Sequence, residues 1–409
     1  MKNIGQLSTA CGNQAKFGSQ MNALKTIFNA CMYIEDGIIA WIGTSDEAAG
    51  VYFEEEMHVV IDAEGKAVIP GFVDSHTHFI FGGYREDEFL ARLNGAQYLD
   101  ILQMGGGIQA TVGATRKTEP AILKALGLER INEMAKQGIT TLEGKSGYGL
   151  DKDCELKQLH IMKELNEESN IDIVSTYLGA HAIPDEFKEN HGGYIDFMIN
   201  EILPIIRNEA LAEFCDVFCE EGVFSIEESR RLLIKAKDMG FSIKLHADEI
   251  VTLGGAELSA ELGAISADHL LMISEEGIQS MIDKRVVATL LPNTAFCLSK
   301  PYAPARKLID NGAAVALASD YNPGSCFTNS IPLMIALAVI QMKMTIEEVI
   351  TALTINGAAA IGRADSIGTL EVGKKADFSI LNYTNYKFLV YHTCVNIVKH
   401  VIKEGRIIV

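Results

Sequence analysis

The stretch AVIPGFVDSHTH, residues 67–78, places an apolar run directly before two histidines. The run is rich in Val, Ile and Phe without strict alternation, which is typical of a strand buried on both faces. In an extended chain residues i and i+2 point the same way, so His76 and His78 can present their imidazoles to one cation. This stretch therefore predicts a buried strand that ends at a metal site.

Seven further runs of the same character follow, and helical patterns separate them. One such helix begins at the capping box of Ser225 and Glu228 and stops at Gly240. Eight repeats of this kind predict an α/β fold, a (β/α)₈ TIM-type barrel of parallel strands. An open doubly wound sheet is the alternative, disfavoured because no Gly-rich loop follows the first strand. The seven runs are 138–147, 171–181, 215–224, 241–249, 264–271, 286–296 and 313–320.

Both ends of the chain have a different, hairpin-like character. Asp-Gly and Glu-Gly pairs suited to tight turns lie within 32–43 and 59–70, and 368–382 and 398–409 resemble them. We expect residues 1–66 and 366–409 to form one composite β-sandwich domain beside a barrel of residues 67–365. The long connection 79–118 falls where such barrels keep their active sites.

Composition excludes several classes of protein. The chain has 409 residues, 48% of them apolar, and a net charge of 35 − 54 = −19. The apolar share excludes intrinsic disorder, and the acidic balance argues against nucleic acid as a partner. Eight scattered cysteines do not form a disulfide framework, and no apolar run predicts a signal peptide or a membrane partner. We therefore expect a cytoplasmic protein.

Four further residues with metal or acid–base chemistry fall at predicted strand ends, which converge at one mouth of a barrel. They are His181, His246, His269 and Asp320. We expect His76, His78, His246 and Asp320 to bind one Zn²⁺ or Fe²⁺/Fe³⁺ ion per subunit, with a position left for water. Glu249 and His269 are candidates for proton transfer. A second metal bridged by a carbamate on Lys145 is the alternative, and we expect one metal.

The long connection also carries groups suited to an anionic substrate. Arg85 and Arg92, with Tyr84 and Tyr98, follow His78, and an Arg fork binds a carboxylate. The alternative is that these arginines pair with the neighbouring acids Glu86, Asp87 and Glu88. The turn after Asp320 offers polar groups for a ligand, or serves only as a helix cap; its residues are Asn322, Gly324 and Ser325.

These residues, with the stretch PGFVDSHTH, resemble the amidohydrolase superfamily. Motifs over residues 67–330 are similar to its histidine-degradation branch, which opens the ring of 4-imidazolone-5-propanoate to N-formimidoyl-L-glutamate. They are FGGYREDEFLARLNGAQY, GGGIQATVGATR, TTLEGKSGYGL, YLGAHAIP, DVFCEEGVFS, KLHADE, ADHL and LASDYNPGS. Ser75, Asn293 and Cys297 depart from the expected pattern.

The resemblance implies a hydrolase that acts by attack of a metal-activated water, with a small anionic substrate and a homodimeric assembly. It implies the same four metal ligands. Its implied substrate contacts are Arg85, Tyr98, Tyr148, His181, Glu249, Asn322, Gly324 and Ser325. Whether Glu249, His269 or Asp320 is the general base stays open at this point.

Two other functions remain as alternatives. The first is a deaminase of a cyclic base with the same metal geometry, and the arginines of the long connection argue against it. The second is a catalytically silent barrel that serves as a scaffold, although all four candidate ligands are present.

Overall fold

Eight parallel strands form the central sheet of the computed structural model, which describes residues 1–48, 50, 59–96 and 106–409. Their order follows the sequence from β5 to β12, and an isolated parallel bridge between Thr77 and Tyr321 brings the two end strands together. The nearly closed barrel confirms the predicted fold class. The strands are β5 (Phe72–Asp74), β6 (Ile139–Lys145), β7 (Asp172–Ala180), β8 (Phe214–Cys219), β9 (Ser242–Ala247), β10 (Ser266–His269), β11 (Val287–Leu290) and β12 (Val315–Leu317).

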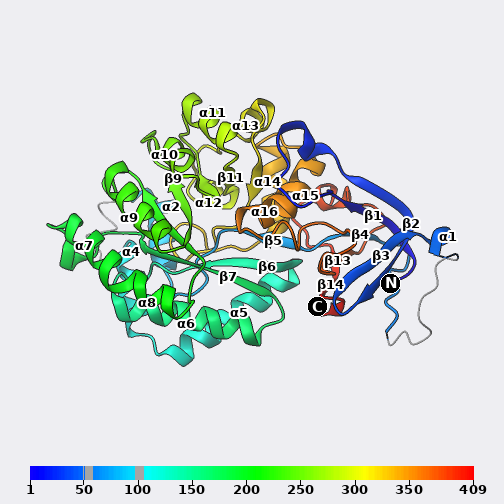
Figure 1. Cartoon of the computed structure of the whole chain (residues 1–409), viewed down its shortest axis with the longest axis horizontal. Helices are drawn as coiled ribbons and strands as arrows, with labels where there is room; N and C mark the ends of the chain where they lie inside the picture. The colour runs from blue at the N-terminus through cyan, green and yellow to red at the C-terminus, as the bar shows by residue number, and fades with distance from the viewer. Residues whose placement is uncertain (49, 51–58, 97–105) are drawn as a thin grey trace.

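Helices cover the outside of this barrel (Figure 1). The capping box predicted at Ser225 is present, because its hydroxyl and the Glu228 carboxylate each accept a backbone N–H. The barrel's helices are α2 (Glu86–Leu93), α4 (Ile108–Lys117), α5 (Pro120–Lys136), α6 (Lys152–Glu168), α7 (His191–Phe197), α8 (Leu203–Asn208), α9 (Ile226–Asp238), α10 (Gly255–Leu262), α11 (Glu275–Lys284), α12 (Pro292–Cys297), α13 (Ala305–Asn311), α14 (Ile331–Ile340), α15 (Ile346–Leu353) and α16 (Ile355–Ala360), with the short helices η2 (Asp185–Phe187) and η3 (Met198–Ile202).

The predicted first barrel strand is divided between two sheets. Residues Ala67–Pro70 form β4 of the smaller sheet, and β5 of the barrel begins at Phe72. Gly71 joins them where a Cβ atom would lie 2.4 Å from the Thr140 side chain. The chain can therefore pass from one sheet to the other only through a residue without a side chain.

The smaller sheet is curled and is built from both termini, which lie near it in Figure 1. Two predicted hairpins are present, with turns at Asp36-Gly37 and Glu404-Gly405. The prediction of a hairpin within 59–70 was wrong, because β4 pairs instead with β1 in parallel and with β13. The order is β15-β14-β13-β4-β1-β2-β3, formed by Arg406–Ile407, Val398–Lys403, Phe378–Leu381, Ala67–Pro70, Ile4–Thr9, Lys25–Glu35 and Ile38–Thr44.

The smaller sheet has a core of its own beside that of the barrel. This core includes Leu7, Met32, Val68, Phe378 and Ile402, all fully or almost fully buried. The domain limits 1–66, 67–365 and 366–409 stay a prediction. Three short helices complete this part of the chain: η1 (Gly18–Asn22), α1 (Ser45–Ala48) and α17 (Phe388–Tyr391).

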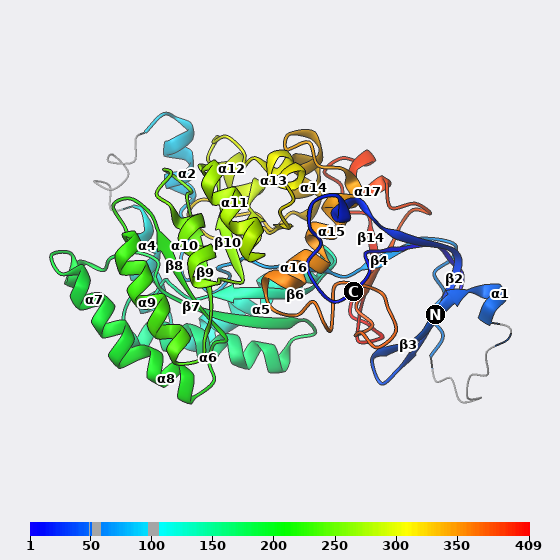
Figure 2. The ribbon, with the colours of Figure 1, turned by 45° about the horizontal axis from the view of Figure 1, so that its top comes forward.

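The connection after β5 contains α2, which stands away from the body of the barrel in Figure 2. None of the residues of α2 is buried. In the part of the chain that the structure describes, no helix has both the length and the apolar character that crossing a membrane requires.

Candidate active site

The seam that closes the barrel also assembles the first three candidate ligands. His76 and His78 follow the end of β5, and the backbone N–H of His78 donates to the carbonyl of Tyr321 at 2.9 Å. The backbone N–H of Asp320 donates to the carbonyl of His76 at 3.0 Å. These bonds between the first and last strands bring His76, His78 and Asp320 to one point, as the sequence predicted.

The ligand atoms of these residues form a small triangle. The Nε2 atoms of His76 and His78 are 3.3 Å apart, and Asp320 Oδ1 lies 3.6 and 3.5 Å from them, respectively. Ligands about 2.1 Å from a tetrahedral zinc ion are roughly 3.4 Å from one another. The triangle therefore has the size of one face of such a site. Burial holds the pKa of both histidines well below the usual range, which keeps them neutral, as metal ligands must be.

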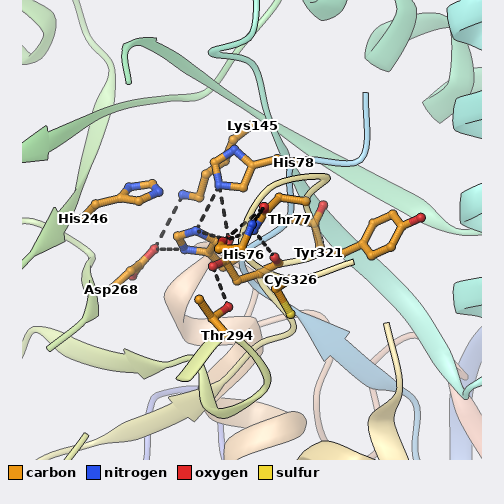
Figure 3. Close-up of polar contacts among 12 residues, drawn as sticks. His76, Thr77, His78, Lys145, His246, Asp268, Thr294, Tyr321 and Cys326 are labelled. Carbon is orange, nitrogen blue, oxygen red and sulfur yellow. Dashed lines mark hydrogen bonds and ion pairs between the residues drawn. The ribbon is translucent and has the colours of Figure 1, made fainter. Parts of the chain in front are cut away.

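His246 adds a third imidazole from β9. A set of ligand atoms from His76, His78 and His246 lies within 4.8 Å, and His76, His269 and Asp320 form a second such set. Among the described residues, the buried Nε2 of His246 has no hydrogen-bond partner. A buried nitrogen without a partner costs free energy unless an ion or a water satisfies it. The donor set and this nitrogen fit a metal ion (Figure 3).

A completely buried ion cluster lies against the backs of two of these histidines. Asp268 Oδ2 accepts from His76 Nδ1 at 2.7 Å, so Nε2 of His76 keeps its lone pair for the site. Asp216 Oδ2 lies 3.0 Å from His246 Nδ1, although the angle is not that of a hydrogen bond. Lys145 lies 2.7 Å from Asp216 and 3.5 Å from Asp268.

Lys244 and Glu143 complete the cluster. Lys244 Nζ lies 2.7 Å from Glu143 Oε2 and donates to the carbonyl of Ser75 at 3.0 Å, directly before His76. The two ammonium groups thus offset the charge of two of the three carboxylates of the cluster, and Asp268 and Asp216 each face an imidazole. Lys145 is the last residue of β6. Its carboxylate neighbours raise its pKa, which keeps it an ammonium group and disfavours a carbamate.

Glu249 and His269 lie together beside the triangle. His269 Nδ1 is 3.5 Å from Glu249 Oε2. Burial raises the pKa of Glu249 to about 8 and lowers that of His269 to about 4. The backbones of His269 and Asp320 are in the left-handed region, with φ of 75° and 50°. Such conformations are costly for residues other than glycine and gather at functional sites.

Arg85 and Arg92 both reach the turn after Asp320. Arg92 Nη2 donates to the carbonyl of Gly324 at 3.0 Å. A Cβ atom on Gly324 would lie 2.1 Å from Arg85 Nη1, so the guanidinium packs directly on this glycine. Arg85 also forms a two-point ion pair with Glu88, in which its Nε donates to Oε2 at 2.9 Å. The alternative of pairing with a neighbouring acid therefore holds for Arg85, and its role toward substrate stays a prediction.

Two predicted substrate contacts lie against His78. The rings of His181 and His78 stack with centroids 4.9 Å apart, and the ring of Tyr148 lies 5.8 Å from that of His78. His181 Nδ1 lies 3.1 Å from the carbonyl of Gly147, which ties His181 to the segment that carries Tyr148. Tyr98 lies outside the described residues.

Asn322 organises the turn that contains the other predicted contacts. Its Oδ1 accepts from the backbone N–H groups of Gly324 and Ser325, each at 2.8 Å, and its Nδ2 donates to the carbonyl of Asp320 at 2.7 Å. Its backbone N–H donates to the carbonyl of Cys326 at 2.9 Å. Asn322 therefore shapes the segment 322–326, which we call the substrate loop. The amide oxygen of Asn322 is already engaged within this loop.

Residues 67–408 match the model of the amidohydrolase family. An imidazolonepropionase from Clostridium tetani is 58% identical over 408 residues, which cover all of this chain and 97% of that protein. One from Parabacteroides distasonis is 55% identical over 407 residues, which cover all of this chain and 98% of that protein. The chain belongs to the imidazolonepropionase family of amidohydrolases.

Two solved structures show the same fold. A guanine deaminase from C. acetobutylicum superposes with a TM-score of 0.72 at 17% identity, covering 99% of each chain. A mutant atrazine chlorohydrolase from Arthrobacter aurescens gives a TM-score of 0.74 at 15% identity, covering 100% of this chain and 94% of that one. The family and the His and Asp groups indicate a metal cofactor in this imidazolonepropionase-family site.

Sequence reasoning missed the ion cluster behind the imidazolonepropionase-family ligands. The sequence does contain a sign of this cluster: charged residues occur two positions before polar residues at the ends of the strands. Lys244 precedes His246 in this way, and Glu143 precedes Lys145, within strands that are almost completely buried. Side chains two positions apart point to the same side of a strand, so such a charge must lie beneath the site.

Proposed function

We propose that this site hydrolyses 4-imidazolone-5-propanoate to N-formimidoyl-L-glutamate. Water adds to the ring carbonyl carbon, the bond from that carbon to the ring nitrogen breaks, and the nitrogen receives a proton. The observation that carries the proposal is the triangle of His76, His78 and Asp320 with Glu249 and His269 beside it. Over 50% identity to proteins named imidazolonepropionase supports the choice of reaction.

The proposed ligands are His76, His78, His246 and Asp320, for one Zn²⁺ or Fe²⁺/Fe³⁺ ion per subunit. When bound, such an ion lowers the pKa of a water and stabilises negative charge that develops on the substrate oxygen. Imidazole and carboxylate donors suit zinc or iron better than magnesium or calcium. Metal analysis of the purified protein, followed by reconstitution with each ion, tests this assignment.

Glu249 is the proposed general base, and His269 positions it. Asp320 has one oxygen toward the imidazoles, and its other oxygen accepts from Thr294 Oγ1 at 2.7 Å. Both oxygens of Asp320 are thus engaged, whereas Glu249 has its carboxylate facing His269 across 3.5 Å. Glu249 then takes the proton of the attacking water at its carboxylate and returns it to the departing ring nitrogen.

Arg85, Tyr98, Tyr148 and His181 are the proposed groups for the propanoate, with the substrate loop closing over the ring. Arg85 is already oriented by Glu88, which fixes the guanidinium before substrate arrives. A carboxylate ligand can approach the face of the guanidinium fork that Glu88 leaves open. An anionic substrate thereby finds a local positive group in a chain whose net charge is −19.

The decisive experiment supplies freshly generated 4-imidazolone-5-propanoate to the metal-loaded protein. We expect loss of its ultraviolet absorbance in step with the appearance of N-formimidoyl-L-glutamate. Ammonia release from guanine or cytosine, without turnover of the imidazolone, would instead indicate the deaminase alternative. Failure to bind zinc or iron at all would indicate a silent scaffold.

A homodimer and a cytoplasmic location complete the proposal. Light scattering coupled to size-exclusion chromatography measures the first, and cell fractionation measures the second. A mass of one chain, 44.6 kDa, in solution would contradict the homodimer.

A further inference from the structure

Two polar side chains interrupt the buried, apolar face of α6. Glu155 and Gln158 are three residues apart and completely buried, so they lie on the same face of the helix. The other buried residues of α6 include Leu159, Met162 and Leu165. A buried polar group costs free energy unless it is hydrogen bonded, so the partners of Glu155 and Gln158 show why these two positions are polar.

Glu155 binds the backbone of residues 147–150, in the loop after β6. Its Oε1 accepts from the N–H groups of Gly149 and Leu150 at 2.8 and 2.9 Å, and its Oε2 accepts from that of Gly147 at 3.1 Å. The backbones of Gly147 and Leu150 are in the left-handed region, with φ of 107° and 54°. Such a conformation is costly for a leucine and persists only where its surroundings hold it, as the Glu155 carboxylate does here.

Gln158 bridges two backbone segments at the mouth of the barrel. Its Oε1 accepts from the N–H of Tyr148 at 3.2 Å, and its Nε2 donates to the carbonyl of Ile80 at 2.7 Å. The reversed orientation of the amide would place a donor against the N–H and an acceptor against the carbonyl, so only this orientation satisfies both partners. Ile80 lies between His78 and Arg85 in the chain. One buried amide thus joins the backbone that carries Tyr148 to the backbone that leads to Arg85.

The helix α5, which packs beside α6 (Figure 1), holds the neighbouring carbonyls in the same way. Arg130 of α5 is almost completely buried, and its Nη1 donates to the carbonyls of Phe79 and Phe81 at 2.8 and 2.9 Å. Its guanidinium also lies over the ring of Phe81, 3.5 Å from the centroid. Side chains of α5 and α6 therefore bind three successive carbonyls of residues 79–81, which fixes the path of the chain toward Arg85.

Tyr148 is the side chain that the other end of this bridge holds in place. Its ring is almost completely buried, with its centroid 5.8 Å from that of His78 and 5.3 Å from that of His181. Burial raises the pKa of the Tyr148 phenol above its usual range, so the hydroxyl stays protonated and can donate a hydrogen bond to a carboxylate. The position of this neutral donor follows from the position of the backbone that Gln158 binds.

We propose that Gln158 is a positioning residue for substrate binding, which sets the separation between the Tyr148 hydroxyl and the Arg85 guanidinium that receive the propanoate. Gln158 acts only through the two backbone groups that it binds. The inference rests on the proposed function, because these substrate groups are those of the ring-opening reaction. Contacts to the propanoate stabilise the bound substrate and the transition state alike, so displacing them raises KM and leaves kcat nearly unchanged.

The test compares Gln158→Met with the unaltered, metal-loaded chain. Methionine keeps the length of the side chain and removes the amide, and we expect a rise in KM of about 3–10-fold with kcat within about twofold. Hydrogen–deuterium exchange of the peptide that contains residues 146–151 is measured by mass spectrometry without substrate. This peptide should exchange faster in Gln158→Met, because the N–H of Tyr148 loses its acceptor. Gln158→Asn is a milder variant that keeps the amide but is too short to reach both partners, and it should change KM and exchange in the same direction.

Asn356 of α16 provides the matched control. It is also a completely buried amide that bridges two backbone segments, because its Nδ2 donates to the carbonyls of Lys16 and Val315. Val315 begins β12, at the opposite end of this strand from Asp320. Asn356→Leu should therefore change neither KM nor the exchange of residues 146–151. An unchanged KM or unchanged exchange in both Gln158 variants, or an equal rise in KM in Asn356→Leu, would overturn the proposal. The exchange is read without substrate, so absence of ring-opening activity in the unaltered chain contradicts the proposed function without concealing this result.

Discussion

The Nδ1 atom of His76 lies 2.7 Å from the Oδ2 atom of Asp268, and both side chains are completely buried. A carboxylate in this position fixes the tautomer of the imidazole, so the opposite nitrogen is always free to bind a cation. Asp268 itself is held by Ser266, whose hydroxyl donates to its other oxygen at 2.7 Å. Asp268 and Ser266 thus set the orientation of His76, a proposed metal ligand.

Replacing Asp268 should weaken metal binding. Asp268→Ala removes the acceptor for His76 Nδ1, and loss of such a partner typically lowers metal affinity about 10–100-fold. Competition with a chromophoric chelator measures the Zn²⁺ dissociation constant. Asp283→Asn, on the exposed side of α11, is the matched control and should leave it unchanged. Equal affinity in Asp268→Ala and the unaltered chain would contradict this role.

Replacing Arg85 should affect substrate binding more than turnover. Loss of a charge-assisted hydrogen bond to the propanoate costs about 1.5–3 kcal/mol, which corresponds to roughly a 10–100-fold rise in KM for Arg85→Ala. Steady-state kinetics separate KM from kcat. Arg231→Ala, which removes an exposed arginine on α9, should change neither. An unchanged KM in Arg85→Ala would remove Arg85 from the carboxylate site.

The activity should depend on pH through Glu249. A general base must be ionised, so kcat/KM falls as the pH falls through its pKa. Burial raises the pKa of Glu249 from 4.5 to about 8, and a bound cation nearby lowers it again. We expect the acidic limb of the pH profile between these two values.

Glu249→Gln provides the matched variant for this pH dependence. It keeps the shape of the side chain and should reduce kcat by about 10²–10⁴-fold, with loss of the acidic limb. Full turnover in Glu249→Gln would assign the base to another group.

The buried ion cluster predicts an effect on stability. Lys145→Met leaves Asp216 and part of the charge of Asp268 without a partner inside the barrel. Removing one member of a buried ion pair costs about 3–5 kcal/mol of unfolding free energy. Urea denaturation of the metal-free protein measures this quantity. Lys136→Met, at an exposed position, should change it by less than about 0.5 kcal/mol.

The sequence was sufficient for the barrel and for the residues at its mouth. Runs of Val, Ile and Leu mark strands that are buried on both faces, and the C-terminal ends of such strands meet on one side. His76, His246 and Asp320 could therefore be assigned to one site although they are far apart in the chain. The pair Pro70-Gly71 marks a possible break in this run, but the sequence contains no sign of which sheet each half joins.

Contacts between residues that are far apart in the chain could not be predicted from the sequence either. The pairing of β4 with β1 and β13, rather than within 59–70, depends on strands far from β4 in the chain, and β13 lies more than 300 residues away. Lys145 and Asp216 are likewise identified as partners only in three dimensions, since either could have been satisfied by other charges. The pairing of Arg85 with Glu88 was among the alternatives, and the spacing alone did not decide it.

The position of β4 has a consequence for biosynthesis. This strand lies between β1, which precedes the barrel in the chain, and β13, which follows it. A nascent chain that has completed the barrel still presents one side of β4 with open backbone N–H and C=O groups until Phe378–Leu381 leaves the ribosome. An uncovered strand edge invites pairing with other chains. Chains that stop before Phe378 should therefore be the species that aggregate, because β13 is the strand that covers the open side of β4.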